Sequence, residues 1–235
     1  MSDIKKYYTE LNLKCSEVLV YSLDQPRHDL VASTHSSIFD YTTCIDVLKG
    51  RAEYDILKVA IREFQMALLS VNMGLYNQAF IGLRFFLERT LVAVMFSAKE
   101  IDLRLWLRGE MDTTWASLIN ADTGIFSSPF CRAFFPELWG ETKHFERIAQ
   151  KVYRECSEYV HGNISVQDKI PEKLEFNEHL FKEWHTKAQT IRRLLLFVFC
   201  LRYLKFIGKD SLQKTEAILI SDFGNLHAVR DIFNK

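Results

Sequence analysis

Apolar residues recur every three to four positions in four long segments, residues 53–71, 75–98, 141–161 and 175–207. This spacing indicates amphipathic or buried α-helices. A short polar break, Asn72-Met73-Gly74, separates the first two segments and predicts a tight turn between antiparallel helices. The pattern therefore predicts an all-α protein built on an antiparallel helical bundle.

The chain divides into three parts by the clarity of this pattern. Residues 1–52 show no clear period: EVLVYSL fits either a strand or a helix, and DQPRHD and LKGR indicate turns. We expect an irregular or mixed N-terminal segment there. The helical bundle is expected over residues 53–207, with short helices and turns between residues 101 and 140. Residues 208–235 are expected to form a C-terminal helical tail.

The segment 75–98 is apolar nearly all the way round, so it is expected to be the central helix. It also carries Arg84 and Glu88, one turn apart, on the side shared by Phe80 and Leu91. Charges in such surroundings must be paired. The two residues are therefore an intrahelical ion pair, a brace for a nearby site, or both.

Composition limits the kinds of partner. Thirty basic and thirty acidic residues cancel, so the chain has no overall field that would draw it to nucleic acid or to an anionic membrane. Any contact with nucleic acid must come from a local patch. The most apolar run, residues 194–201, is far shorter than the roughly 20 residues of a membrane span. The first residues lack the features of a secretion signal, and we expect no membrane association.

The cysteines and histidines show no metal or disulfide pattern. Five scattered cysteines favour a reducing, cytoplasmic setting over a disulfide framework or a zinc site. His179 and His185 lie six positions apart and do not share a helical face well. Phosphate-binding loops, dinucleotide fingerprints and His-Glu-x-x-His helices are missing from the sequence. We therefore expect neither a metal nor a cofactor. The cysteines are Cys15, Cys44, Cys131, Cys156 and Cys200.

The segment 141–161 has one apolar and one basic face. Its apolar residues, Cys156 among them, fall in an arc of about 140° on a wheel of 100° per residue. On the opposite side, five residues fall within about 60° of one another and form a basic ridge. These are Lys143, Arg147, Gln150, Arg154 and His161. The acidic Glu141, Glu146 and Glu155 are expected to point away from this ridge, and only Glu158 lies near it.

Arg154 and His161 are about 20° apart around the helix axis and roughly 10.5 Å apart along it. Gly162 is the residue type expected just beyond a helix C-terminus, which puts His161 in the last turn. There the helix dipole favours a protonated imidazole, a suitable proton donor. Such a ridge could hold neighbouring phosphate groups, but it could equally be an ordinary solvated face. Tyr153 and Tyr159, at the flanks of the apolar arc, could pack in the core or stack on a base.

In this region the chain resembles the HEPN superfamily, helical domains marked by an arginine followed, after four to six residues, by a histidine near a helix end. RECSEYVH, from Arg154 to His161, has six intervening residues. AFIGLRFFLERTL, residues 79–91, is similar to the upstream helix of many HEPN proteins, with an arginine before a Leu-Glu pair. The resemblance covers residues 53–207.

The resemblance implies a bundle of four or five helices that dimerises so that two Arg-His faces meet. Many members are metal-independent endoribonucleases of antiviral defence or toxin–antitoxin systems, and others are non-catalytic. It implies an RNA substrate and, as partner, a second copy or a cognate defence or antitoxin protein. The implied roles are a phosphate clamp for Arg154, acid or base for His161, RNA binding for Lys143, Arg147 and Gln150, and support for Arg84, Glu88 and Asn163.

Two features depart from the family pattern. Members often have a small polar residue directly after the arginine, whereas this chain has Glu155. Gly162 and Asn163 follow His161, so the tyrosine that some members carry two places beyond the histidine is missing. The alternative to a ribonuclease is a non-catalytic helical adaptor in a multi-protein defence complex.

Overall fold

A hairpin of two antiparallel helices forms the centre of the computed structural model, which describes residues 3–234 apart from the side chains of Ser165 and Gln167. The helices are α3 (Tyr54–Asn72) and α4 (Tyr76–Phe96), joined by a turn in which Gly74 has a φ of +79°. Glycine adopts this left-handed conformation without the steric cost that other residues incur. The two predicted helices and the tight turn are confirmed.

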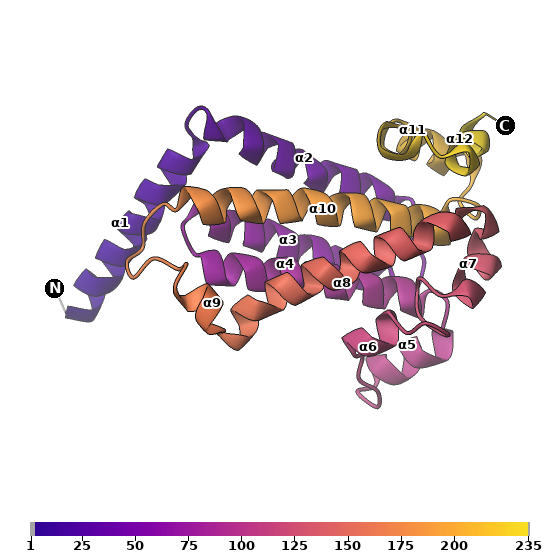
Figure 1. Ribbon diagram of the computed structural model, residues 1–235, viewed down its shortest axis with the longest axis horizontal. Coiled ribbons are helices and arrows are strands. Elements are labelled where there is room, and N and C mark those ends of the chain that lie inside the picture. The colour runs from indigo at the N-terminus through magenta and orange to yellow at the C-terminus, as the bar shows by residue number, and fades with distance from the viewer. Residues whose placement is uncertain (1–2, 235) are drawn as a thin grey trace.

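Helix α4 is the central helix of the core, as its sequence predicted. It packs against α3, α8 (Trp139–His161) and α10 (Glu178–Tyr203), and Figure 1 shows these helices running along the length of the molecule. Along it, Phe80, Leu83 and Leu87 are completely buried. Gly82 allows α4 to approach α3 closely, because a Cβ atom at this position would lie 2.9 Å from the Cβ of Ala67 on α3.

Two stacked aromatic pairs fix how α8 sits on the bundle. Tyr159 stacks on Phe80 of α4 with a centroid distance of 3.9 Å, and Phe145 stacks on Phe197 of α10 at 3.8 Å. Both pairs lie on the apolar arc of α8. Because they are nearly four turns apart, they fix the rotation of the helix along most of its length. The opposite face of α8 therefore points to solvent.

The N-terminal segment is helical rather than irregular or mixed, which corrects the expectation for residues 1–52. It forms α1 (Asp3–Leu23) and α2 (Arg27–Asp46). The apolar period is weak in α2 because Thr34 and Ser37 occupy inward positions, both fully buried or nearly so. In α1 only Cys15, Val18 and Ser22 are buried, because the first half of the helix extends beyond the bundle.

Arg192 of α10 joins three elements by ion pairs. Its Nε lies 2.7 Å from Asp40 of α2, and its Nη1 lies 2.8 Å from Asp222 of α11 (Lys209–Phe223). A half-buried arginine between two carboxylates is a charge-assisted pairing of the stronger kind. It attaches α2 and the C-terminal helices to the bundle, at the top of the view in Figure 1.

Short helices complete the fold, as expected for residues 101–140 and for the C-terminal tail. None of the described helices combines the length and hydrophobicity needed to cross a bilayer. The remaining elements are α5 (Glu100–Leu107), α6 (Trp115–Leu118), α7 (Ser128–Phe134), the 3-10 helix η1 (Pro136–Leu138), α9 (Ile164–Gln167) and α12 (His227–Phe233).

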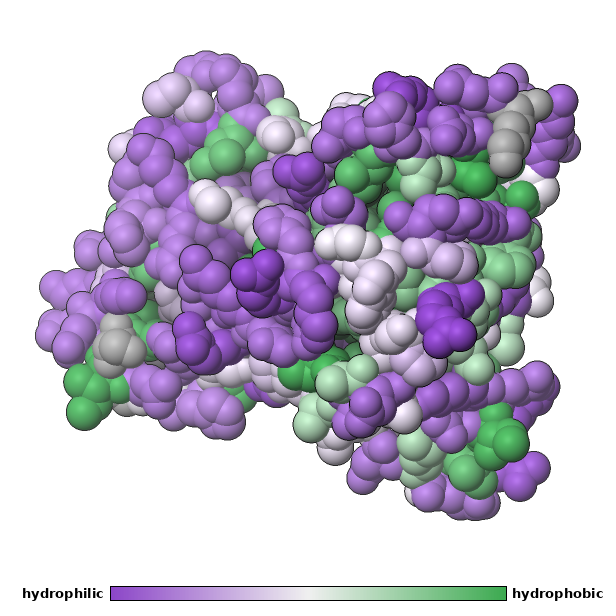
Figure 2. Space-filling model, turned by 45° about the vertical axis from the view of Figure 1, so that its right-hand side comes forward, coloured by the Kyte–Doolittle hydropathy of each residue, from purple (hydrophilic) through white to green (hydrophobic). Residues whose placement is uncertain are grey.

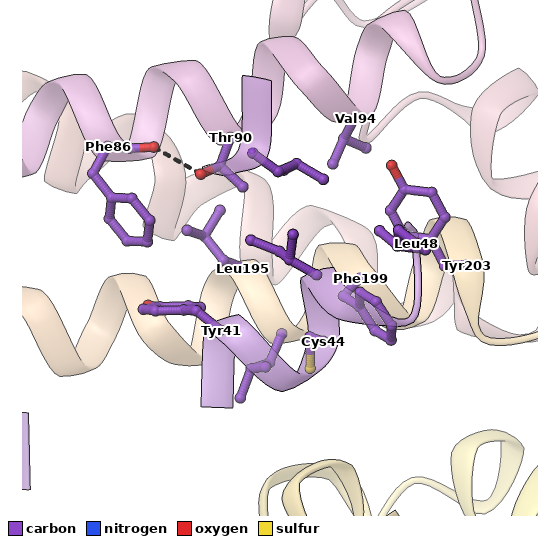
Figure 3. A pocket seen from close by; sticks show the side chains of 12 residues that line it. Tyr41, Cys44, Leu48, Phe86, Thr90, Val94, Leu195, Phe199 and Tyr203 are labelled. Carbon is purple, nitrogen blue, oxygen red and sulfur yellow. Dashed lines mark hydrogen bonds between the residues drawn. The ribbon is translucent and has the colours of Figure 1, made fainter. Parts of the chain in front are cut away.

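A small internal cavity of about 30 Å³ lies between α2, α4 and α10 (Figure 3). Its walls are mainly apolar, and the Thr90 hydroxyl donates to the backbone carbonyl of Phe86, drawn as a dashed line. The Tyr41 hydroxyl, which also belongs to this lining, has no hydrogen-bond partner among the described residues. Such a volume has room for about one water molecule. The core is therefore closely packed.

All five cysteines are buried as free thiols. Burial raises the pKa of Cys44 and of Cys156 to about 12, and that of Cys131 to about 11. These thiols are therefore protonated at neutral pH. The expectation that Cys156 packs in the core is confirmed, because its side chain has no exposed surface.

The contact at Gly82 leads to a test of the core. Gly82→Ala should lower the free energy of unfolding by about 1–3 kcal/mol in urea titrations, because the added methyl group overlaps Ala67. This cost should exceed the gain in helix propensity of about 1 kcal/mol. Ala67→Gly in the same chain should restore part of the loss. Gly140→Ala, where a Cβ would meet no atom within 4 Å, is the control and should not destabilise.

Candidate functional site

Arg154 and His161 both lie on the exposed face of α8. Neither side chain makes a hydrogen bond or an ion pair with another described residue. His161 is the last residue of the helix, and Gly162 follows in the left-handed conformation with a φ of 61°. The predicted end of the helix is therefore confirmed. An exposed cation and an exposed imidazole thus share one edge of α8, seven residues apart.

The side chains in the first half of the ridge are engaged in contacts within α8, which the sequence did not indicate. Lys143 Nζ lies 2.8 Å from Glu146 Oε2, and Gln150 Nε2 donates to Glu146 Oε1 at 3.2 Å. Arg147 Nε donates to the carbonyl of Lys143 at 3.1 Å. The expectation that Glu146 points away from the ridge is wrong, because its carboxylate reaches two ridge residues from the flank of the helix. The unpaired end of the ridge is the one that holds Arg154 and His161.

Glu155, directly after Arg154, is paired across the interface with α10. Its carboxylate accepts a short hydrogen bond from Lys187, which also lies 3.3 Å from Glu183. Burial alone would lower the pKa of Lys187, but the hydrogen bond and the two carboxylates outweigh it and raise that pKa. Glu155 therefore points toward α10, away from the ridge, as expected. Arg154 borders a shallow groove of about 290 Å³ that contains this network.

Arg84 joins α4 to the other flank of α8. Its Nη2 lies 3.7 Å from Glu88 Oε2 and donates to the hydroxyl of Tyr153 at 2.6 Å. The ring of Tyr153 stacks on Trp115 of α6 with a centroid distance of 3.7 Å and an interplanar angle of 4°. Arg84 and Glu88 are thus an intrahelical ion pair, and Arg84 is also a brace for α8.

The two tyrosines of α8 pack within the protein. Tyr159 is buried against Phe80, and Tyr153 is stacked on Trp115. Neither presents a free ring on the ridge for stacking on a base. The pairing of Tyr153 with Trp115 and Arg84 was not predictable from spacing, because the three residues come from separate segments of the chain.

Asn163 lies just beyond α8 and is exposed. Its backbone N–H donates to the carbonyl of Glu158 at 3.3 Å, and its own carbonyl accepts from Val166 at 2.9 Å. These bonds close α8 and begin α9. Its side chain makes no hydrogen bond with any described residue, so its contribution is to the backbone path next to His161.

His185, whose spacing from His179 argued against a metal site, is a buried histidine of α10. Its Nδ1 lies 2.8 Å from the Thr34 hydroxyl of α2, and its Nε2 has no partner among the described residues. Burial lowers the pKa of His185 to about 4. The imidazole is therefore neutral at physiological pH and helps to hold α10 against α2. Within residues 3–234, no group of three or more His, Cys, Asp or Glu residues is placed to hold a metal ion.

Comparison with protein-family models, with curated proteins and with solved structures gave no match. The resemblance to HEPN domains therefore rests on the residues and on their order along the helices.

The buried imidazole of His185 predicts a loss of stability in mild acid. The unfolded chain binds a proton at His185 near pH 6.5, whereas the folded chain does so only near pH 4. Stability is thus fully present above pH 6.5 and declines as the pH falls toward 4. The free energy of unfolding should fall by about 2 kcal/mol from this residue between pH 7 and pH 5.

Urea titrations of His185→Gln and of His144→Gln, an exposed histidine on α8, measure this effect. His185→Gln should be less sensitive to pH than the natural chain, and His144→Gln should keep the natural dependence. Equal pH dependence in all three proteins would contradict the assignment.

Proposed function

We propose that this protein is a metal-independent endoribonuclease of HEPN type. The observation that carries the proposal is the pairing of exposed, unbonded Arg154 and His161 side chains on one edge at the end of α8. A residue needed only for folding is usually buried or bonded to its neighbours. The proposed setting, phage defence or a toxin–antitoxin system, follows from the family resemblance.

The chemistry required for RNA cleavage suits these two groups. The 2′-oxygen forms a bond to phosphorus as the bond from phosphorus to the 5′-oxygen breaks. A base takes the proton of the 2′-hydroxyl, and an acid gives a proton to the leaving 5′-oxygen. Arg154 stabilises the charge on the phosphate oxygens, since guanidinium forms paired hydrogen bonds with them. His161 serves as acid or base, because an imidazole nitrogen can accept a proton or donate one.

A second copy of the chain supplies the second proton-transfer group. One His161 cannot readily serve as base and acid on opposite sides of the same phosphate, whereas two copies related by a twofold axis provide one imidazole each. Lys143, Arg147 and Gln150 extend the ridge and hold the RNA backbone, with Glu146 limiting the charge that they offer.

Arg154→Ala and His161→Ala should each reduce cleavage of labelled single-stranded RNA by about 100-fold or more, measured with EDTA present. Both residues are exposed and unbonded, so the melting temperature should not change in either variant. The matched controls are Arg62→Ala on α3 and His179→Ala on α10, which remove the same side-chain types from exposed positions elsewhere. Their cleavage rates should equal that of the natural chain.

Two outcomes would contradict the proposal. One is an equal rate of cleavage in all five proteins, which would indicate a contaminating nuclease. The other is a natural chain that cleaves no RNA, alone or with proteins encoded beside it. The second outcome would favour the adaptor function.

Helix α1 favours this second candidate, a non-catalytic adaptor that assembles through helix packing. The first half of α1 extends beyond the bundle, and Figure 2 shows hydrophobic side chains on the surface at its N-terminal end. On a wheel of 100° per residue, four exposed apolar residues of α1 fall on the side that further along buries Cys15 and Val18. They are Ile4, Tyr7, Tyr8 and Leu11.

A second copy of the chain is the proposed occupant of this α1 stripe, because it continues an existing helix–helix contact and both proposed functions require assembly. Sedimentation velocity at micromolar concentration should show a dimer for the natural chain. Tyr8→Glu combined with Leu11→Glu should shift it to monomer, because charges would replace apolar contacts. Leu13→Glu, on the opposite face of α1 at 57% exposure, should leave the dimer intact. A natural chain that is strictly monomeric would contradict both the stripe and the shared catalytic site.

A further inference from the structure

A groove of about 390 Å³ lies on the bundle between α4, α5 and the chain just before α6. The short helices α5 and α6 lie below the long helices in Figure 1. Its volume is in the range of small-molecule sites. Its lining combines aromatic, basic and acidic side chains: Arg84, Phe85, Glu88, Arg89, Val92, Trp106 and Thr113.

Two polar groups in this groove lack hydrogen bonds. The Glu88 carboxylate is 22% exposed and accepts no hydrogen bond from a described residue, since Arg84 Nη2 lies 3.7 Å away. The Nε of Arg84 is buried and has no acceptor among the described residues. Polar groups at such positions are normally hydrogen-bonded to protein, ligand or water. A ligand with N–H donors would supply the hydrogen bonds that the Glu88 carboxylate lacks.

The groove also offers a free cation and an aromatic wall. Arg89 is partly buried and makes no ion pair or hydrogen bond with another described residue. Phe85 is 45% exposed, which is unusual for phenylalanine within a core helix, and Trp106 is half-buried beside it in the lining. Exposed aromatic rings stack on flat heterocycles. The expected ligand is therefore planar, with N–H donors on one edge and acceptors on another.

Guanine has this arrangement of donors and acceptors. Its N1–H and N2–H₂ groups form a donor pair that fits one carboxylate, and its O6 and N7 form an acceptor pair that fits one guanidinium. Adenine presents an unprotonated N1, and uracil has a carbonyl on each side of its single N–H. Either base would therefore place an acceptor atom against an acceptor oxygen of the Glu88 carboxylate. We propose that this groove binds a guanine base, with Glu88 on the N1–N2 edge, Arg89 on the O6–N7 edge and Phe85 stacked on the ring.

This inference goes beyond the proposed ribonuclease and does not depend on it. The lining of the groove comes from α4, α5 and Thr113, whereas Arg154 and His161 lie on the outer edge of α8. The base could belong to a free nucleotide or to single-stranded RNA, and both present the same edges.

Isothermal titration calorimetry with GMP, AMP, CMP and UMP tests the groove directly. GMP should bind at least tenfold more tightly than the other three, which corresponds to one well-placed pair of hydrogen bonds. Glu88→Gln should abolish this preference, since the amide replaces one acceptor with a donor. Phe85→Ala should weaken GMP binding, while Phe39→Ala, a 65%-exposed phenylalanine on α2, should not.

Two short oligonucleotides, one with a single guanine and one with adenine in its place, separate the two sources of the base. If the guanine oligonucleotide binds more tightly than GMP, and Glu88→Gln removes this binding, RNA is the source of the base. If GMP binds as tightly as the guanine oligonucleotide, the free nucleotide is the source. Failure of both probes to bind, or equal binding of all bases, would overturn the proposal. Arg154→Ala combined with His161→Ala should retain guanine binding, so a failure of the ribonuclease proposal leaves this result unchanged.

Discussion

The rotation of α8 about its own axis is the constraint on which the arrangement of the site depends. Stacking of Phe145 on Phe197 and of Tyr159 on Phe80 fixes this rotation near both ends of the helix. A helix turned by one residue would move every side chain by 100° and would carry Arg154 from the outer edge to an interface. The aromatic packing of the core therefore decides which polar residues of α8 meet solvent.

Polar contacts on the two flanks of α8 support the same orientation. On one side Glu155 pairs with Lys187 of α10, and on the other Tyr153 accepts a hydrogen bond from Arg84 of α4. Lys187 is only 12% exposed, and removal of Glu155 would leave it with Glu183 alone, 3.3 Å away. Such a loss costs more than the loss of a fully exposed pair, because less water can replace the missing carboxylate. The flanks of α8 are thus structural, and its outer edge is free for a ligand.

The helices that could be predicted from the sequence are those whose buried faces consist of apolar side chains. Helices α3, α4, α8 and α10 have such faces, and their limits agree with expectation to within a few residues. Helix α2 was missed because hydroxyl groups such as Thr34 occupy its inward side, where a hydrogen bond to His185 replaces apolar packing. Helix α1 was missed because exposed apolar residues such as Leu13 and Val20 lie opposite its apolar stripe and obscure the helical spacing of that stripe.

The candidate site was predictable only in part, for a related reason. Spacing along one helix placed Arg154 and His161 on a common edge, since helical geometry alone relates residues seven positions apart. Contacts between distant segments, such as Tyr153 with Trp115 or Glu155 with Lys187, depend on how helices pack and leave no mark in local spacing. The link from Glu146 to Lys143 and Gln150 lies within one helix, but it depends on the reach of a flexible side chain.

Because all five thiols are buried, the stability of this fold does not depend on whether its surroundings are oxidising or reducing. Attack on oxidants and exchange with other disulfides require a thiolate that is accessible. The cysteines of this chain are enclosed, and no disulfide holds its helices together. The folded protein should keep its structure with or without reductant, and a cysteine introduced at a surface position would be the one that reacts with a thiol-specific label.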